Sequence, residues 1–238
     1  MSHTLIIIPT YNEVDNIESI IQCIARLDFR CDVLVVDDSS PDKTADLVRN
    51  LSNQFKNIHL IVRSQKEGIG KAYQEGFTWA LKHEYQYIFQ MDADFSHNPQ
   101  DLPKMKCLLE KECDMVVGSR YSKGISVVNW PLGRIILSLL GSFYVRILLD
   151  MPIRDSTSGF VGYKTQVLST LDLDELKFVG YAYQIEMKYR THVKGFKMKE
   201  LPIIFLNREF GKSKMNYKII REAIFGVPYL RLNKSRFK

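Results

Sequence analysis

Asp92 and Asp94 are the residues of this sequence with the clearest potential for chemistry. Side chains at positions i and i+2 of an extended segment point the same way, so the two carboxylates repel each other unless a cation lies between them. Mg²⁺ is typically held in proteins by one or two carboxylates together with phosphate oxygens of a substrate. The pair therefore indicates a site for a divalent cation and a diphosphate, although a lone D-x-D occurs by chance in many chains.

A second acidic segment, Asp37–Asp42, strengthens this interpretation. Within it, Ser40 and Asp42 are better explained as caps of a helix that begins at Thr44, because short polar side chains favour helix N-termini. Capping explains the D-x-D pair less well, since the next helix is expected near residues 99–101 with Asn98 as its own cap. Asp37 and Asp38, at the start of this acidic segment, thus support a site for a cation and a diphosphate.

The elements that would position these acids alternate along the first half of the chain. Short apolar runs are separated by stretches with helical spacing, a pattern typical of a parallel sheet covered by helices on both faces. Ligands of such sheets bind at the carboxyl ends of the strands, where the acids stand. We therefore predict an α/β fold with a mostly parallel, Rossmann-like sheet whose first five strands lie at residues 5–8, 33–36, 58–62, 87–91 and 115–117.

The second half contains a strongly apolar helix at residues 132–149, which carries Arg134 and Arg146. Its pattern fits a buried packing helix and an interfacial helix equally well. Residues 199–206 are expected to form one further strand. A closing amphipathic segment begins at residue 216, and Pro228 is expected to break or kink it.

Charge is concentrated at the C-terminal end. The chain has a net charge of +6, and residues 208–238 hold nine Lys or Arg against two Asp or Glu. Such a basic tail suits phosphate, nucleic acid or an anionic membrane surface, but a solvated end would look the same. The loop at residues 208–214 groups cations beside a glycine and a serine, which suits phosphate capture.

The amino-acid composition excludes several structural classes of protein. The 238 residues are 45% hydrophobic and 25% charged, which excludes a disordered, coiled-coil or fibrous chain. The four cysteines lack zinc-ribbon spacing and are expected to be thiols in a reducing compartment. No signal peptide or transmembrane helix is expected, because the longest uncharged apolar stretch covers only residues 135–145. We expect one domain, 1–238, made of a first half (1–121), a second half (122–215) and a basic amphipathic segment (216–238).

Taken together, these motifs resemble the family 2 glycosyltransferases of the GT-A fold, and among them the polyprenyl-phosphate (dolichol-phosphate) mannosyltransferases. The resemblance runs in order from residue 9 to residue 215. The matching segments are Pro9–Glu13, Asp37–Asp42, Asp92–His97, Gly118–Tyr121, Asp155–Phe160, Gln184–Met187 and residues 208–215.

The resemblance implies a role for individual residues of this chain. Asp92 and Asp94 would bind Mg²⁺ or Mn²⁺, and Ser96 stands where some relatives carry a further glutamine ligand. The acceptor phosphate would be received by Arg120, Arg134 and Ser138. The catalytic group would comprise Asp94, Arg120, Arg208 and Lys214. The nucleotide sugar would be held by Pro9, Tyr11, Glu13, Val36, Asp38, Asp92, Ala93, Asp94, Arg208 and Lys214.

The resemblance further implies the reaction and its setting. Mannose would pass with inversion from GDP-mannose to a polyprenyl monophosphate, which is already anionic and needs positioning by cations more than a general base. The chain would work without nucleic acid, peripherally on the cytoplasmic face of a membrane, with its C-terminal helices at the lipid interface. The sequence leaves open whether a membrane-embedded subunit accompanies it.

Three alternative functions stay open at this point. The same lipid phosphate could be glycosylated from another donor, such as UDP-glucose or UDP-GlcNAc. The acceptor could instead be a sugar hydroxyl, although the Q-x-x-R-W pattern of processive relatives is missing. A non-catalytic nucleic-acid-binding protein would use the basic tail but leaves Asp92 and Asp94 unexplained.

Overall fold

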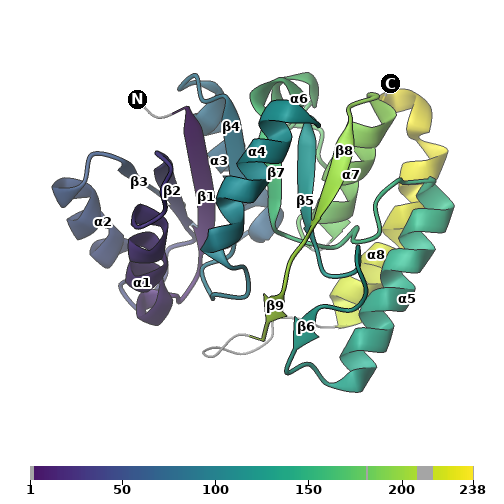
Figure 1. The fold of residues 1–238 in the computed structure, drawn as a ribbon, viewed down its shortest axis with the longest axis horizontal. Helices are drawn as coiled ribbons and strands as arrows, with labels where there is room; N and C mark the ends of the chain where they lie inside the picture. Colours follow the sequence, from purple (N-terminus) through teal and green to yellow (C-terminus); the bar gives the residue numbers. More distant parts are fainter. Residues whose placement is uncertain (1–2, 181, 208–216, 238) are drawn as a thin grey trace.

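The computed structural model of the chain describes residues 3–180, 182–207 and 217–237. Its centre is a seven-stranded sheet with the order β3-β2-β1-β4-β7-β5-β8, in which only β7 runs antiparallel to its neighbours (Figure 1). The mostly parallel α/β fold predicted from the sequence is confirmed. The strands are β1 (Thr4–Thr10), β2 (Asp32–Asp37), β3 (Ile58–Val62), β4 (Tyr87–Gln90), β5 (Met115–Ser119), β7 (Val161–Lys164) and β8 (Met198–Pro202).

Helices cover both faces of this sheet because its central strands are apolar on both sides. In β1, Leu5 and Ile7 pack into the core on one face, whereas Ile6 and Ile8 pack into the core on the other. The Ile6 face is covered by α1 (Val14–Ala25), α2 (Thr44–Gln54) and α4 (Leu102–Lys111), and α4 follows the 3₁₀ turn η1 (Pro99–Asp101). The Leu5 face is covered by α3 (Ile69–Leu81), α6 (Thr165–Thr170) and α7 (Ala182–Val193).

Two long helices stand at the β8 end of the sheet. In Figure 1, α5 (Leu132–Leu149) and α8 (Tyr217–Leu232) lie side by side, and the 3₁₀ turn η2 (Lys234–Phe237) follows α8. The Tyr144 hydroxyl of α5 donates a hydrogen bond of 3.1 Å to the Ile224 carbonyl of α8. Val145 and Leu149 reach the core, so the packing interpretation of α5 holds for one side of the helix.

Two local expectations differ from the structure. The expected single strand at residues 199–206 is divided, because the chain leaves the sheet after Pro202 and forms β9 (Phe205–Leu206). β9 pairs with β6 (Val127–Val128). Of the break or kink expected at Pro228, the break does not occur, because α8 continues through that residue. Proline cannot bond the carbonyl four residues earlier, but Tyr144 satisfies that carbonyl of Ile224 instead.

The polar segment after β2 is only partly a helix cap. Asp42 accepts hydrogen bonds from the backbone N–H groups of Thr44, at the start of α2, and of Val14, at the start of α1. Ser40 instead accepts a hydrogen bond from the Asn12 N–H, so it joins two loops and does not cap α2. These contacts fix the loops after β1 and β2 against each other.

Candidate active site

The loops that follow β1, β2 and β4 leave the sheet at one edge, and each contains a non-glycine residue in the left-handed backbone region. These residues are Asn12 (φ 58°), Ser39 (φ 52°) and Phe95 (φ 58°). Such backbone costs energy and persists where the surrounding structure holds it, most often around functional sites. The sheet edge predicted from the sequence therefore carries strained backbone in each of these three loops.

The D-x-D pair lies at this edge, and its two carboxylates differ in exposure. The Asp92 side chain is 33% exposed and the Asp94 residue 8%. The Asp92 N–H donates to His97 Nδ1 at 3.2 Å, and the Tyr73 hydroxyl donates to Asp92 Oδ1 at 3.4 Å. Asp94 Oδ1 accepts the Ser96 N–H at 3.1 Å. These contacts hold both carboxylates in place, and Asp92 is the one that reaches solvent.

His97 supports this turn as a neutral ring. Burial lowers the pKa of His97, and its Nδ1 acts as an acceptor, which places the ring proton on Nε2. The ring stacks on Phe160, with centroids 4.9 Å apart. His97 thus fixes the backbone of Asp92 without placing a positive charge beside the acidic pair.

The donor set at the pair suits a divalent cation shared with a substrate. Among residues 3–180, 182–207 and 217–237, no three His, Cys, Asp or Glu side chains gather into a complete metal site. Asp92 and Asp94 supply hard carboxylate oxygens, and Mg²⁺ or Mn²⁺ held this way takes its other ligands from phosphates and water. The Ser96 contact to Asp94 runs through its backbone N–H.

The segments expected to hold a nucleotide meet beside β1 and β2. Pro9 and Val36 are paired in the sheet register, and the Asp38 N–H donates to the Thr10 carbonyl at 3.0 Å. The Lys66 ammonium lies 3.5 Å from the centre of the Tyr11 ring. Of the residues that the resemblance assigns to the nucleotide, Pro9, Tyr11, Val36 and Asp38 therefore lie close together.

Asp38 owes its position to Arg63, a residue that the sequence did not indicate. Arg63 is buried, and its Nη1 lies 2.7 Å from Asp38 Oδ1. The same guanidinium also pairs with Glu67 and Glu75. Burial raises the pKa of Asp38 and outweighs the opposing charge of Arg63. Arg63 thus keeps a buried carboxylate in a fixed orientation.

Asp37 and Glu13 are tied into the scaffold. The Asp37 carboxylate is fully buried and accepts hydrogen bonds from Thr10 Oγ1, Ser40 N and Ser40 Oγ. Glu13 precedes α1, where its Oε2 accepts a hydrogen bond from Asn16 Nδ2 at 3.0 Å. Asp37 is therefore a structural residue, which leaves Asp38 as the member of that pair expected to hold the nucleotide.

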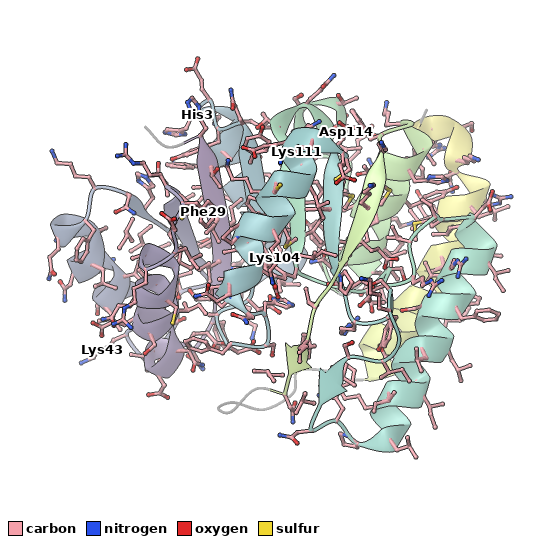
Figure 2. The ribbon with its side chains drawn as sticks, in the orientation of Figure 1. His3, Phe29, Lys43, Lys104, Lys111 and Asp114 are labelled. Carbon is pink, nitrogen blue, oxygen red and sulfur yellow. The ribbon has the colours of Figure 1, made fainter. Side chains whose placement is uncertain are left out.

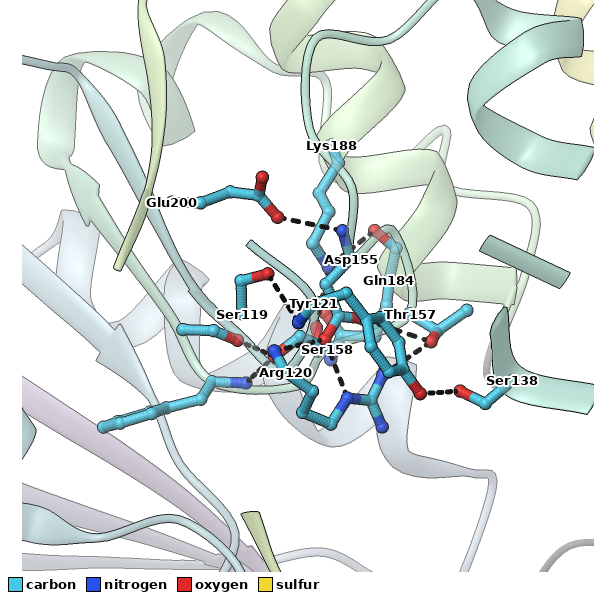
Figure 3. Close-up of polar contacts among 12 residues, drawn as sticks. Ser119, Arg120, Tyr121, Ser138, Asp155, Thr157, Ser158, Gln184, Lys188 and Glu200 are labelled. Atoms are coloured by element: carbon cyan, nitrogen blue, oxygen red, sulfur yellow. Dashed lines mark hydrogen bonds and ion pairs between the residues drawn. The ribbon is translucent and has the colours of Figure 1, made fainter. Parts of the chain in front are cut away.

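A second charged centre lies where β5 ends, built on Arg120 and Asp155 (Figure 3). Arg120 Nε lies 2.7 Å from Asp155 Oδ2, and Arg120 Nη2 lies 2.6 Å from Asp155 Oδ1 and 2.8 Å from Thr157 Oγ1. Burial alone would raise the pKa of Asp155, but the charge and hydrogen bonds of Arg120 hold that pKa below its usual value. Both members of the pair are buried, at 8% and 0% exposure.

The other predicted acceptor residues surround the same place. The Arg134 guanidinium stacks 3.8 Å from the centre of the Trp130 ring, and Arg120 lies 5.5 Å from that ring. The Tyr121 hydroxyl donates a hydrogen bond of 2.7 Å to Ser138 Oγ. The structure thus brings Arg120, Arg134 and Ser138 together around two aromatic rings. Arg208 and Lys214, predicted for both substrates, lie outside the described residues.

Comparison of the sequence with known proteins identifies the family of this chain. The model of glycosyl transferase family 2 matches residues 5–172, which is well over half of the chain. The chain belongs to glycosyl transferase family 2. The resemblance drawn from the motifs is confirmed.

Curated relatives within the family cover nearly the whole chain. An undecaprenyl-phosphate mannosyltransferase of Micrococcus luteus is 40% identical over 225 residues, which is 94% of this chain and 91% of that protein. A polyprenol monophosphomannose synthase of Mycolicibacterium smegmatis is also 40% identical over 225 residues, 94% of this chain and 85% of that protein.

Solved structures share the fold at lower identity. Glucosyl-3-phosphoglycerate synthase of Mycobacterium tuberculosis, in complex with Mn²⁺, UDP-glucose and phosphoglyceric acid, has a TM-score of 0.69 at 17% identity, covering 97% of this chain and 79% of that chain. A mannosyltransferase of Pyrobaculum calidifontis, in complex with GDP-Man and Mn²⁺, has a TM-score of 0.58 at 18% identity, covering 100% of this chain and 65% of that chain. The GT-A fold expected for this glycosyltransferase is therefore confirmed.

Proposed function

We propose that this glycosyltransferase transfers mannose from GDP-mannose to a polyprenyl monophosphate, releasing GDP. The observation that carries the proposal is the 40% identity, over 94% of the chain, to an undecaprenyl-phosphate mannosyltransferase and a polyprenol monophosphomannose synthase. The site supports it with an acidic pair at one sheet edge and two buried or stacked arginines nearby. A direct test of the donor is calorimetry with Mn²⁺, in which GDP-mannose is expected to bind and UDP-glucose is not.

The acidic pair is suited to the leaving group. A divalent cation on Asp92 and Asp94 would neutralise charge on the departing diphosphate. The protein contributes two carboxylates that are already oriented by Tyr73 and Ser96. Asp38, held by Arg63, would orient the nucleoside beside them.

The arginine centre is suited to the acceptor. A lipid monophosphate is anionic at neutral pH, so it requires cations that position it for attack and no side chain to deprotonate it. Arg134 extends from the first turn of α5 and Arg120 from the end of β5, both against Trp130. The acceptor phosphate would therefore lie between the sheet edge and the start of α5.

If this placement is correct, Arg134→Ala should raise the KM for polyprenyl phosphate about 10- to 100-fold, the effect of losing one charged hydrogen bond. The affinity for GDP-mannose should stay within about twofold, because no donor residue touches Arg134 in this proposal. Steady-state kinetics and calorimetry separate the two effects. Arg146→Ala, on the same helix but away from Trp130, is the matched control, and an equal loss of donor affinity in Arg134→Ala would contradict the placement.

We also propose that α5 and α8 lie on the surface of an anionic membrane. By length and composition α5 could cross a membrane, since its 18 residues have a mean hydropathy of 1.7 and 17% of them are buried. Its packing against α8 and the core favours a surface position, in which one apolar side of the helix would face lipid. Exposed apolar and aromatic side chains on the described parts of the two helices include Leu132, Ile136, Leu137, Leu140, Phe143, Tyr144, Ile147, Ile224, Phe225 and Leu232.

Replacing one of these side chains should release the protein from lipid. Phe143 is 61% exposed, and Phe143→Asp removes an apolar group from the lipid interface and adds a charge that anionic lipid repels. We expect binding to vesicles of anionic phospholipid to fall about tenfold or more in a sedimentation assay. Phe55→Asp, which changes a 52% exposed phenylalanine at the far end of the sheet, should bind as the parent does. Equal binding by all three proteins would refute the surface assignment.

A further inference from the structure

Phe205 of β9 contacts residues of both the acidic pair's turn and the arginine centre, and the roles proposed above do not use it. Its ring packs edge to face against two other rings, with centroids 5.5 Å from His97 and 5.3 Å from Trp130 and interplanar angles of 78° and 76°. The Arg120 guanidinium carbon lies 5.5 Å from the centre of the same ring. Contacts of aromatic rings with each other and with cations are directional, so they fix where each partner lies.

Through His97 the Phe205 ring reaches the donor side of the site. His97 Nδ1 accepts the Asp92 N–H at 3.2 Å, and the imidazole is 1% exposed and stacked on Phe160. The imidazole is thus held by Phe160 and Phe205, so a shift of either ring would move the backbone of Asp92. Because the proposed cation lies on the acidic pair, the position of Phe205 bears on the position of the donor diphosphate.

Through Trp130 the same ring reaches the acceptor side. The Arg134 guanidinium stacks 3.8 Å from the centre of the Trp130 ring, and Arg134 Nη1 donates to Asn207 Oδ1 at 3.3 Å. Asn207 lies two residues after Phe205, so one short segment contacts both Trp130 and Arg134. A displacement of this segment would therefore move the cations that are proposed to hold the acceptor phosphate.

The backbone of β9 explains why Phe205 faces the site. After Pro202 the chain leaves the sheet, and the Phe205 N–H donates to the Ser126 carbonyl at 2.9 Å where β9 pairs with β6 (Figure 1). Ile204 and Leu206 are 62% and 45% exposed, as expected when alternate side chains of a strand face opposite sides. Two strands of two residues each contribute little stability alone, so the ring contacts of Phe205 help to hold β9 in place.

The separation between the two centres matters for a transfer that joins their ligands. A bond forms between the anomeric carbon of the donor and an oxygen of the acceptor phosphate, while the bond to the departing diphosphate breaks. The two reacting atoms must first approach to about 3–3.5 Å, and a misplacement of about 1 Å can cost about 100-fold in rate. The cation on the acidic pair would position the first atom, and the arginine centre would position the second.

We infer that Phe205 is a positioning residue that sets the separation between the cation at the acidic pair and the acceptor phosphate at the arginine centre. It acts through His97 on one side and through Trp130 and Arg120 on the other. The inference rests on the proposed transfer to a lipid phosphate and adds the side chain that aligns the two substrates.

Steady-state kinetics distinguish alignment from simple support of the fold. Phe205→Leu and Phe205→Met keep an apolar side chain but remove the ring, so kcat should fall about 10- to 100-fold while both KM values stay within about threefold. Phe205→Tyr keeps the ring and should retain a kcat close to that of the parent. The matched control is Phe196→Leu, which changes a half-buried phenylalanine that packs on the core where β8 begins; it should lose stability but keep kcat.

A distance measurement tests the same point without turnover. Bound Mn²⁺ speeds the relaxation of nearby phosphorus nuclei, so the ³¹P relaxation of a saturating short-chain polyprenyl phosphate, with GDP and Mn²⁺ present, reports its distance from the cation. This relaxation should differ between the parent and Phe205→Leu and should be equal in the parent and Phe196→Leu.

The two experiments together decide the inference. An unchanged kcat or an unchanged relaxation in Phe205→Leu would overturn it, and so would a loss that appears only as raised KM values. A kcat in Phe205→Tyr as low as in Phe205→Leu would also overturn it, because the ring alone would then not be what aligns the substrates. Absence of any transfer from GDP-mannose by the parent would instead refute the proposed function.

Discussion

Asp94→Asn is expected to reduce mannosyl transfer at least about 1,000-fold while the protein remains folded. Asparagine keeps the size of the side chain and an oxygen that can accept the Ser96 N–H, so the turn at the end of β4 should persist. It removes one of the two negative charges on which a cation at the diphosphate depends. Transfer rates at saturating Mg²⁺ or Mn²⁺, with circular dichroism as the folding check, measure the effect.

The matched control for this variant is Asp114→Asn. Asp114 precedes β5, at the opposite edge of the sheet (Figure 2), where it accepts hydrogen bonds from Lys197 N and Lys164 Nζ. We expect this variant to lose some stability and retain its activity. Near-normal turnover by Asp94→Asn would remove the acidic pair from the mechanism.

Asp155→Asn is expected to be the most destabilising single change at the site. It leaves the Arg120 guanidinium buried without a compensating charge, which typically costs about 3–5 kcal/mol. The free energy of unfolding from urea denaturation measures this loss. Transfer should fall as well, because Arg120 then loses the contacts that hold it beside Trp130.

The pH dependence gives an independent check on this pair. The pKa of Asp155 is lower in the folded protein than its ordinary value, so its contribution to stability is present above about pH 4 and is lost as pH falls through the folded pKa. The difference in unfolding free energy between the parent and Asp155→Asn should therefore shrink below about pH 4. A difference that stays constant down to pH 2 would show that the charge of Asp155 is not what stabilises the fold.

Local patterns were enough to predict the first five strands and the placement of the D-x-D pair. Each of those strands is a continuous apolar run, and a parallel sheet directs their carboxyl ends to one edge whatever the details of packing. The helix at 132–149 was predicted with the bounds that the structure has. Its apolar composition could not distinguish burial from exposure, because the helix has one side of each kind.

The features that sequence reasoning missed depend on contacts between distant segments. The role of Arg63 follows only from its contact with Asp38, which lies 25 residues away in the sequence. The continuation of α8 past Pro228 depends on the Tyr144 hydroxyl of α5. His97 stood inside a quoted motif, but its role depends on the position of the Asp92 backbone.

The measurement that tests the central claim most directly is transfer of labelled sugar to lipid. Purified protein, Mn²⁺ and a polyprenyl phosphate would be incubated with labelled GDP-mannose and, separately, with labelled UDP-glucose. Label is expected in the organic phase from GDP-mannose alone, and no label is expected with Asp94→Asn. Label from UDP-glucose alone would contradict the mannose assignment, and no lipid-borne label from either donor would contradict the lipid phosphate acceptor.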